Sequence, residues 1–260
     1  MRIFQVDAFT TELFSGNPAG VCLVEDDRDD AWMQAVAAEM NLPETAFLSP
    51  GEDGWHLRWF TPTVEVDLCG HATLAASHIL WEAGEADPGD RLRFQTRSGV
   101  LTARPSDRGI LLDFPADPPT AVPPPDGLVA AIGAPAVWSG RGRVFWILEL
   151  ADEGAVRGLR PDLGALGRAC DTGVVVTAGG DGGDRDFVSR MFAPSMGIDE
   201  DQVTGATHCI LSPYWTDRLG RTDLVGYQAS SRGGTVGVRL VGDRVELGGR
   251  AVTFLRGSID

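Results

Sequence analysis

Two stretches of the chain carry the same pattern, and this pattern decides the expected fold. In each, an arginine, an aromatic residue and a proline end a predicted strand, an aspartate follows, and a glycine begins a predicted helix. The stretches are Arg58–Pro62 (RWFTP) with Asp67 and Gly70, and Arg190–Pro194 (RMFAP) with Asp201 and Gly205. Residue types and element order agree together, so the chain is interpreted as an internal duplication.

Alternation of apolar and polar residues predicts many short strands around these stretches. In the first half the predicted strands are Arg2–Phe9, Ala19–Glu25, Thr45–Leu48, Trp55–Phe60, Leu92–Thr96, Val100–Ala103 and Ile110–Phe114, with a hairpin turn at Ser98-Gly99. In the second half they are Val144–Leu150, Val174–Thr177, Phe187–Phe192, Leu224–Ala229, Thr235–Leu240, Arg244–Leu247 and Val252–Leu255.

Helices interrupt the strands at corresponding places. The predicted helices are Ala31–Met40 with Asp30 as its cap, His71–Trp81 with Gly84 as its stop, Asp162–Cys170, and a helix that begins at Gly205. Proline lacks a backbone N–H, so Pro213 is expected to kink or end this last helix early.

A proline-rich segment between Phe114 and Pro125 separates the two halves, because clustered prolines favour an extended, semi-rigid backbone. The predicted domains are therefore 1–117 and 128–260, joined by a linker at 118–127. We expect an α+β fold with two similar domains and a ligand-binding cleft between them.

The composition excludes several classes of partner. A net charge of −15 disfavours nucleic acid, whose phosphates bind lysine and arginine. No apolar run is long enough to span a membrane, and the N-terminus lacks the features of a secretory signal, so a cytoplasmic protein is expected. The four cysteines are scattered, so reduced thiols are expected.

The two helix starts are candidates for anion binding. A helix N-terminus presents unpaired N–H groups and a partial positive charge, and glycine at Gly70 and Gly205 lets a ligand approach the backbone closely. His71 at the first turn is a candidate acid or base. Asp201 is placed to orient a partner or to cap the loop. Residue physics alone does not single out Glu44, in the turn before a predicted strand.

At these residues the chain resembles the PhzF (phenazine biosynthesis-like) family, which shares its fold with diaminopimelate epimerase. The matching segments span almost the whole chain in order: Asp7–Thr10, Phe14–Val21 (FSGNPAGV), Glu39–Phe47 (EMNLPETAF), Asp67–Thr73 (DLCGHAT), Arg190–Pro194, Glu200–Gly205 (EDQVTG) and Gln228–Gly234 (QASSRGG).

The resemblance implies two pseudo-symmetric domains, each a mixed, β-barrel-like sheet around a central helix, usually assembled as a homodimer. It implies an isomerase that moves a proton within a small carboxylate-bearing substrate and needs neither cofactor nor metal. Glu44 matches the catalytic glutamate, and His71 and Asp201 match assisting groups. Asn17, Gly70, Gly205 and Ala206 match the substrate-binding positions.

The chain departs from the family pattern at two positions. Gln202 stands where the family commonly has proline, and Ala206 stands where it commonly has serine. The missing hydroxyl at Ala206 removes a possible hydrogen bond to substrate, so the substrate is expected to differ from the phenazine precursor. The product stays open between an isomer, an epimer and a cyclised compound.

Other readings are compatible with parts of the sequence. An epimerase or racemase of this fold would use two opposed thiols; Cys69 is in place for one, but Thr204 precedes Gly205 in the second half. A catalytically idle binding protein is another alternative. A metal site is disfavoured, because its candidate ligands lack the usual zinc spacing. These candidates are Cys69, His71, His78, His208 and Cys209.

Overall fold

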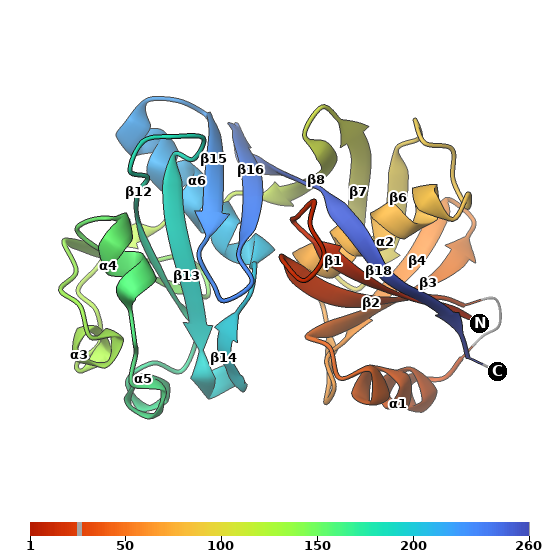
Figure 1. Cartoon of the computed structure of the whole chain (residues 1–260), viewed down its shortest axis with the longest axis horizontal. Coiled ribbons are helices and arrows are strands. Elements are labelled where there is room, and N and C mark those ends of the chain that lie inside the picture. Colours follow the sequence, from red (N-terminus) through yellow and green to blue (C-terminus); the bar gives the residue numbers. More distant parts are fainter. Residues whose placement is uncertain (25–27, 260) are drawn as a thin grey trace. The chain divides into compact units, whose positions relative to one another are not determined.

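A computed structural model describes residues 1–24 and 28–259 (Figure 1). The described chain divides into two compact units, one formed by Met1–Phe114 with Leu247–Asp260 and the other by Pro115–Glu246. Both units combine a mixed sheet with helices, so the predicted α+β class is confirmed. Among the described residues, no helix is both long and apolar enough to cross a membrane.

The first unit consists of a sheet and two helices. Its strands are β1 (Arg2–Ala8), β2 (Asn17–Leu23), β3 (Glu44–Gly51), β4 (Gly54–Phe60), β5 (Glu65–Val66), β6 (Leu92–Thr96), β7 (Gly99–Ser106), β8 (Gly109–Pro115) and β18 (Ala251–Ser258). Its helices are α1 (Asp30–Met40) and α2 (Gly70–Glu82). The predicted strand end at Glu25 lies outside the described residues.

Helix α2 is the central helix of this unit. It packs against β1, β2, β3 and β18, and most of its residues are buried, including Leu74, Ile79 and Leu80. A helix that is apolar on all sides is stable only when other elements surround it. The sequence of α2 therefore requires the sheet to wrap around it.

The second unit repeats the plan. Its strands are β9 (Thr120–Ala121), β10 (Trp138–Arg141), β11 (Trp146–Glu149), β12 (Val174–Gly179), β13 (Phe187–Ala193), β14 (Ile198–Asp201), β15 (Asp223–Gln228) and β16 (Gly234–Val241). The chain returns to the first unit within β17 (Arg244–Gly249), at Leu247. Its helices are α3 (Leu128–Ile132), α4 (Glu153–Gly158), α5 (Leu163–Ala169), the 3-10 turn η1 (Pro194–Met196) and the buried α6 (Gly205–Leu219).

Strand pairing is the same in both units. In the first unit β1 pairs antiparallel with β2, β2 pairs parallel with β3, and β3 pairs antiparallel with β4. In the second unit β10 pairs antiparallel with β11, β11 pairs parallel with β12, and β12 pairs antiparallel with β13. Next, β4 pairs antiparallel with β5 and parallel with β6, as β13 does with β14 and β15. The duplication inferred from sequence therefore extends to the order and direction of the strands.

A repeated ion pair fixes the approach to each central helix. Arg58 of β4 binds both carboxylate oxygens of Glu65, at 2.8 and 2.7 Å. Arg190 of β13 binds both oxygens of Glu200, at 2.7 and 2.9 Å. Such bidentate pairs combine charge attraction with a fixed planar geometry. Each pair holds the short strand that leads into α2 or α6.

The structural register revises one part of the sequence pattern. Trp59 pairs with Val66 in the first unit, and Met191 pairs with Asp201 in the second. Asp201 is thus the counterpart of Val66 rather than of Asp67. The acidic residue that both halves share is the glutamate five positions before the helix glycine.

The predicted domain limits differ from the observed units. The second domain was predicted to include 247–260, but β18 pairs antiparallel with β1 and belongs to the first unit. This pairing satisfies the hydrogen-bonding edge of β1, which a sheet edge requires when it is buried. The predicted linker at 118–127 contains β9, which pairs with β10. The first unit's N-terminal segment ends at Phe114 rather than at residue 117.

Two local predictions about helix ends, the Asp30 cap of α1 and an early end of α6 at Pro213, are wrong. The carboxylate that caps α1 belongs to Asp29, which accepts from the Trp32 N–H at 2.8 Å, whereas Asp30 is the first helical residue. Pro213 does not end α6, which continues to Leu219. Proline leaves the carbonyl four residues earlier without its helical donor.

That carbonyl belongs to Cys209, and it accepts instead from the backbone N–H of Asp117 at 3.0 Å. The chain segment that enters the second unit therefore replaces the missing helical hydrogen bond. An unbroken α6 results.

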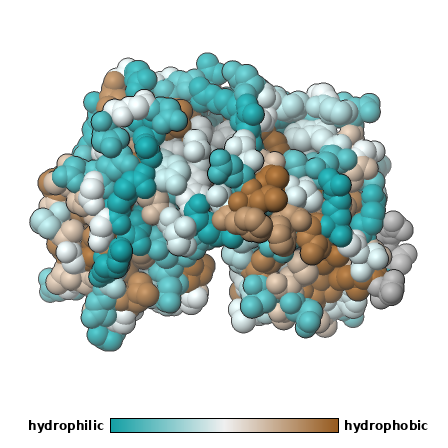
Figure 2. All heavy atoms as spheres, viewed as in Figure 1, coloured by the Kyte–Doolittle hydropathy of each residue, from teal (hydrophilic) through white to brown (hydrophobic). Residues whose placement is uncertain are grey.

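Apolar side chains gather on one exposed face of the first unit (Figure 2). The large apolar residues exposed on this unit include Leu13, Phe14, Phe254 and Leu255, and the rings of Phe14 and Phe254 lie 5.7 Å apart. Exposed apolar patches are common at protein interfaces. Homodimer assembly stays a prediction.

The Arg190 pair should contribute more to stability than the Arg58 pair. Arg190 is also bonded to the carbonyl oxygens of Val156 and Leu159, and its side chain is more deeply buried than that of Arg58. We predict that Arg190→Met lowers the free energy of unfolding by about 3–5 kcal/mol, the usual cost of breaking a buried pair. Urea denaturation measures this loss.

Arg58→Met is the matched control. Glu65 keeps a second partner, Arg97, at 2.6 Å, so this variant should lose less than half as much stability. Equal losses in the two variants would contradict the prediction.

Candidate active site

Glu44 is positioned by the turn that follows α1. Asn41 ends α1 in a left-handed conformation (φ 48°), and Pro43 cannot extend a helix, so the chain enters β3 at Glu44. Glu44 lies beside Ala19 in the parallel pairing of β2 with β3. Its carboxylate therefore stands at the beginning of a central strand of the first unit, with a side chain that is mostly buried.

His71 and Cys69 come from the start of α2. Cys69 is the N-cap residue, Gly70 is the first helical residue, and His71 follows within the first turn. Cys69 and His71 are buried, whereas Gly70 is half-buried. Asn17, fully buried at the start of β2, completes the group.

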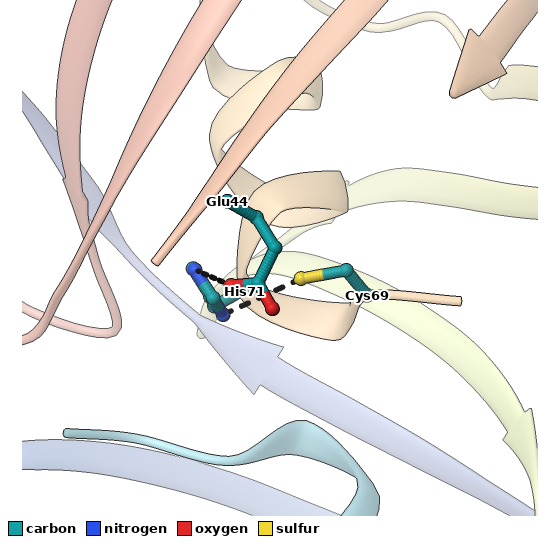
Figure 3. A group of neighbouring side chains, drawn as sticks. All are labelled: Glu44, Cys69 and His71. Atoms are coloured by element: carbon teal, nitrogen blue, oxygen red, sulfur yellow. Dashed lines mark hydrogen bonds and ion pairs between the residues drawn. The ribbon is translucent and has the colours of Figure 1, made fainter. Parts of the chain in front are cut away.

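These side chains converge on the imidazole ring of His71 (Figure 3). Its Nε2 lies 3.2 Å from Oε2 of Glu44, within ion-pair distance although without hydrogen-bond alignment. Its Nδ1 lies 3.2 Å from Nδ2 of Asn17 and 3.5 Å from Sγ of Cys69. One imidazole thus stands between a carboxylate on one side and a thiol and an amide on the other.

The arrangement fits proton transfer better than it fits metal binding. Ligand atoms of Glu44, Cys69 and His71 all lie within 4.8 Å of one another, as a metal site would require. However, the carboxylate approaches Nε2 and the thiol approaches Nδ1, and one metal ion binds a single ring nitrogen. His78, another metal candidate from sequence, contacts Thr253 and Glu82 instead.

Asp201 lies in the second unit, at the end of β14. Its Oδ2 accepts a short hydrogen bond from the hydroxyl of Thr204, the N-cap residue of α6. Gln228 fixes the same turn, because its Oε1 accepts from the Thr204 N–H at 2.9 Å and its Nε2 donates to the Asp201 carbonyl at 2.7 Å. These hydrogen bonds of Gln228 were not predicted. From the sequence, Gln228 was named only as part of the segment Gln228–Gly234 that resembles the family.

The two departures from the family pattern have different structural consequences. Gln202 accepts through Oε1 from the hydroxyl of Ser231 (3.0 Å) and the N–H of Arg232 (3.2 Å), so it anchors the loop after β15. A proline there could make neither bond. Ala206 is exposed next to the buried Gly205 at the start of α6, where it offers no side-chain donor.

The fold of two repeated units is that of the epimerase- and racemase-like proteins. The crystal structure of a probable proline racemase from Agrobacterium radiobacter matches it with a TM-score of 0.63 at 11% identity, covering 100% of this chain and 92% of that one. This likeness concerns the fold alone.

The family model for phenazine biosynthesis-like proteins, PhzC-PhzF, matches residues 6–257, and the chain belongs to this family. An uncharacterized isomerase of Pseudomonas aeruginosa is 48% identical over 100% of this chain and 98% of its own length. One from Halalkalibacterium halodurans is 46% identical over 99% and 97%. The crystal structure of a PhzF family protein from Enterococcus faecalis matches with a TM-score of 0.93 at 41% identity, covering 98% and 97%.

His208, one turn into α6, is a buried base of the second unit. Its Nδ1 lies 2.8 Å from the Thr204 carbonyl and therefore donates, which leaves Nε2 unprotonated. Burial lowers the pKa of His208 from 6.5 to about 4, against the opposing effects of the Thr204 carbonyl and of Asp201. The folded protein therefore holds this imidazole neutral at physiological pH.

This shift makes stability depend on pH. The folded-state pKa lies below the unfolded one, so the unfolded chain takes up the proton first as the pH falls. The contribution of neutral His208 to the free energy of unfolding is fully present above pH 6.5. It is lost as the pH falls toward 4, and the loss at pH 4.5 is about 2–3 kcal/mol. We predict that His208→Asn loses less stability between pH 7 and pH 4.5 than the wild type does, by this amount. The prediction would be contradicted if the wild type and His208→Asn lost the same free energy of unfolding between pH 7 and pH 4.5.

Proposed function

We propose that this protein is an isomerase that shifts a hydrogen within a small carboxylate-bearing substrate, without a cofactor, and that Glu44 is its general acid and base. The observation that carries the proposal is the 3.2 Å approach of Glu44 Oε2 to the buried Nε2 of His71 at the start of α2. Two relatives that cover nearly their whole length are named isomerases, which supports the reaction class.

A single carboxylate is sufficient for this chemistry. Glu44 removes a proton from one carbon of the substrate, holds it on a carboxyl oxygen, and returns it to a second position. His71 Nε2 lies 3.2 Å from the carboxylate, and Asn17 holds the ring from the opposite side. Positioned acid and base groups of this kind contribute roughly 10²–10⁴-fold to a rate.

Binding of the substrate carboxylate is proposed for the helix starts. The first N–H groups of α2, at Gly70, have no partner within the helix and lie next to His71 in the chain. The resemblance assigns the same role to Gly205 and Ala206 of α6, and an assisting role to Asp201. Ala206 contributes a backbone N–H only.

An epimerase is the second candidate, because one observation favours it. Cys69 Sγ lies 3.5 Å from His71 Nδ1, so the first unit has a thiol beside its imidazole. In the second unit the residue that precedes the helix glycine is Thr204, whose hydroxyl is bonded to Asp201. A two-thiol reaction would need a different second cysteine, for which Cys209 is the available residue in α6.

The role of Glu44 is tested by Glu44→Gln, which keeps the size of the side chain and removes its charge. The protein is incubated in D₂O with a panel of small unsaturated carboxylates and α-amino acids, and deuterium incorporation is measured by mass spectrometry. We predict a loss of labelling of about 10²-fold or more with an unchanged melting temperature.

Glu39→Gln is the control, because Glu39 is exposed on α1 and undergoes the same chemical change. It should label the panel at the wild-type rate. Wild-type labelling by Glu44→Gln would refute the assignment of the base. Labelling confined to α-amino acids would favour the epimerase.

The contribution of the second unit is tested by Asp201→Asn in the same assay. Asn still accepts from the Thr204 hydroxyl, so the turn before α6 should persist while the negative charge is lost. We predict a decrease in labelling of about tenfold or more. Asp199→Asn, an exposed change in the same strand, is the control, and equal rates in the two variants would contradict a role for Asp201.

A further inference from the structure

We infer that Thr204 is a positioning residue of the second unit, whose hydroxyl holds the Asp201 side chain in the orientation that hydrogen transfer requires. The inference rests on the proposed function, in which Asp201 assists the reaction, and extends it to a residue that does not react. Neither the general acid/base proposal nor the family resemblance gives the Thr204 hydroxyl a role.

The Thr204 hydroxyl is turned toward Asp201 and away from the helix that follows it. Thr204 is the N-cap residue of α6, but its side chain makes no hydrogen bond to the first turn of this helix. Its Oγ1 instead donates a short hydrogen bond to Oδ2 of Asp201. A hydrogen bond from a hydroxyl to a carboxylate is charge-assisted and stronger than one between neutral groups. This contact therefore fixes the direction of the Asp201 carboxylate.

Helix capping does not explain the orientation of this side chain. Threonine is among the preferred N-cap residues, because its oxygen can accept from an N–H of the first turn. Asp29, Asp152 and Asp162 accept in this way at α1, α4 and α5. The Thr204 oxygen makes no such bond, so its contact with Asp201 is explained better by Asp201 than by the helix.

The main chain of the same turn is held by other residues. The Gln228 amide accepts from the Thr204 N–H at 2.9 Å and donates to the Asp201 carbonyl oxygen at 2.7 Å. The Thr204 carbonyl oxygen accepts from Oγ1 of Thr207 at 2.9 Å and from Nδ1 of His208 at 2.8 Å. Gln228, Thr207 and His208 are fully buried, so water does not compete for these bonds. The turn thus has its own anchors, and the Thr204 hydroxyl acts on a side chain.

A fixed Asp201 side chain matters because an assisting carboxylate must already point at the reacting group. An aspartate without such a contact populates several staggered rotamers. A displacement of about 1 Å in a catalytic group lowers a rate by up to about 10²-fold. The bond from Thr204 selects one rotamer of Asp201 before substrate binds.

The test compares Thr204→Val with Thr204→Ser in the deuterium-labelling assay. Valine has nearly the size of threonine and the same branching, and the extended backbone of Thr204 (φ −109°, ψ 109°) suits it. It lacks the hydroxyl, so we predict a decrease in the labelling rate of about tenfold. Serine keeps the hydroxyl donor, so Thr204→Ser should label within about threefold of the wild-type rate.

Thr207→Val is the matched control, because it makes the same chemical change in the first turn of α6. The Thr207 hydroxyl also supports this turn, but it donates to the Thr204 carbonyl oxygen rather than to the Asp201 carboxylate. Thr207→Val should therefore label at the wild-type rate. Equal losses of labelling in Thr204→Val and Thr207→Val would show structural support alone and would overturn the inference.

A double-mutant cycle separates an effect through Asp201 from an effect on the helix. Thr204→Val and Asp201→Asn are measured singly and together. We predict that Thr204→Val slows labelling by less than about twofold when Asp201→Asn is already present, because both changes disable the same group. A further tenfold loss in the double variant would contradict this, since independent effects multiply in the rate.

A second readout needs no substrate. Crystal structures of the wild type, Thr204→Val and Thr204→Ser are compared at the Asp201 side chain. We predict the wild-type rotamer with serine and a different rotamer, or more than one, with valine. The main chain of residues 200–206 should stay in place in both variants, because Gln228 holds it. An unchanged Asp201 rotamer in Thr204→Val would overturn the inference.

Failure of this inference and failure of the proposed function give different results. If Glu44→Gln still labels the panel, the proposed base is wrong. If Asp201→Asn labels at the wild-type rate, the assisting role of Asp201 is wrong and the inference falls with it. If Asp201→Asn is slow while Thr204→Val keeps the wild-type rate, Asp201 retains its role and only its positioning by Thr204 is wrong.

Discussion

The bidentate Arg–Glu pair is the interaction on which the site of each unit depends. It joins a central strand to the short strand that delivers the chain to the buried helix, as Arg58–Glu65 before α2 and as Arg190–Glu200 before α6. With that approach fixed, the first residues of each helix occupy a defined place at the end of the sheet. A site built from the first turn of a helix needs this constraint, because helix ends otherwise fray.

The duplicated frame carries chemistry that is not duplicated. Thr45 pairs with Phe60 and Val174 pairs with Phe192, so the position of Glu44 corresponds to Gly173. By the same register His71 corresponds to Ala206 and Cys69 to Thr204. Glu44, His71 and Cys69 therefore have no like residue at the matching positions of the second unit, which keeps the helix start and has Asp201 before it. The two units therefore share a fold while the side chains at these positions differ, as sites grafted on a common frame do.

Some features of the site were accessible from sequence because they are local. Glycine before a helix, histidine in its first turn and the proline after a strand each follow from backbone geometry over a few residues. Glu44 was not accessible in this way: it looks like a solvated turn residue, and only the resemblance to a family marked it. Its contact is with His71, 27 positions away in the chain, and no local pattern encodes that contact. Pro213 shows the converse, since its expected helix break is repaired by Asp117, nearly a hundred residues earlier.

The sequence by itself determined the α+β class, the duplication, the family and the starts of both central helices, because periodicity and turn chemistry are properties of neighbouring residues. Only the tertiary structure decided that β18 returns to pair with β1, that glutamates rather than aspartates are the shared acidic residues, and that Asn17, Glu44 and Cys69 surround one imidazole. These outcomes depend on strand register and on side chains distant in sequence. Such distances are fixed only when the sheet closes around its helix.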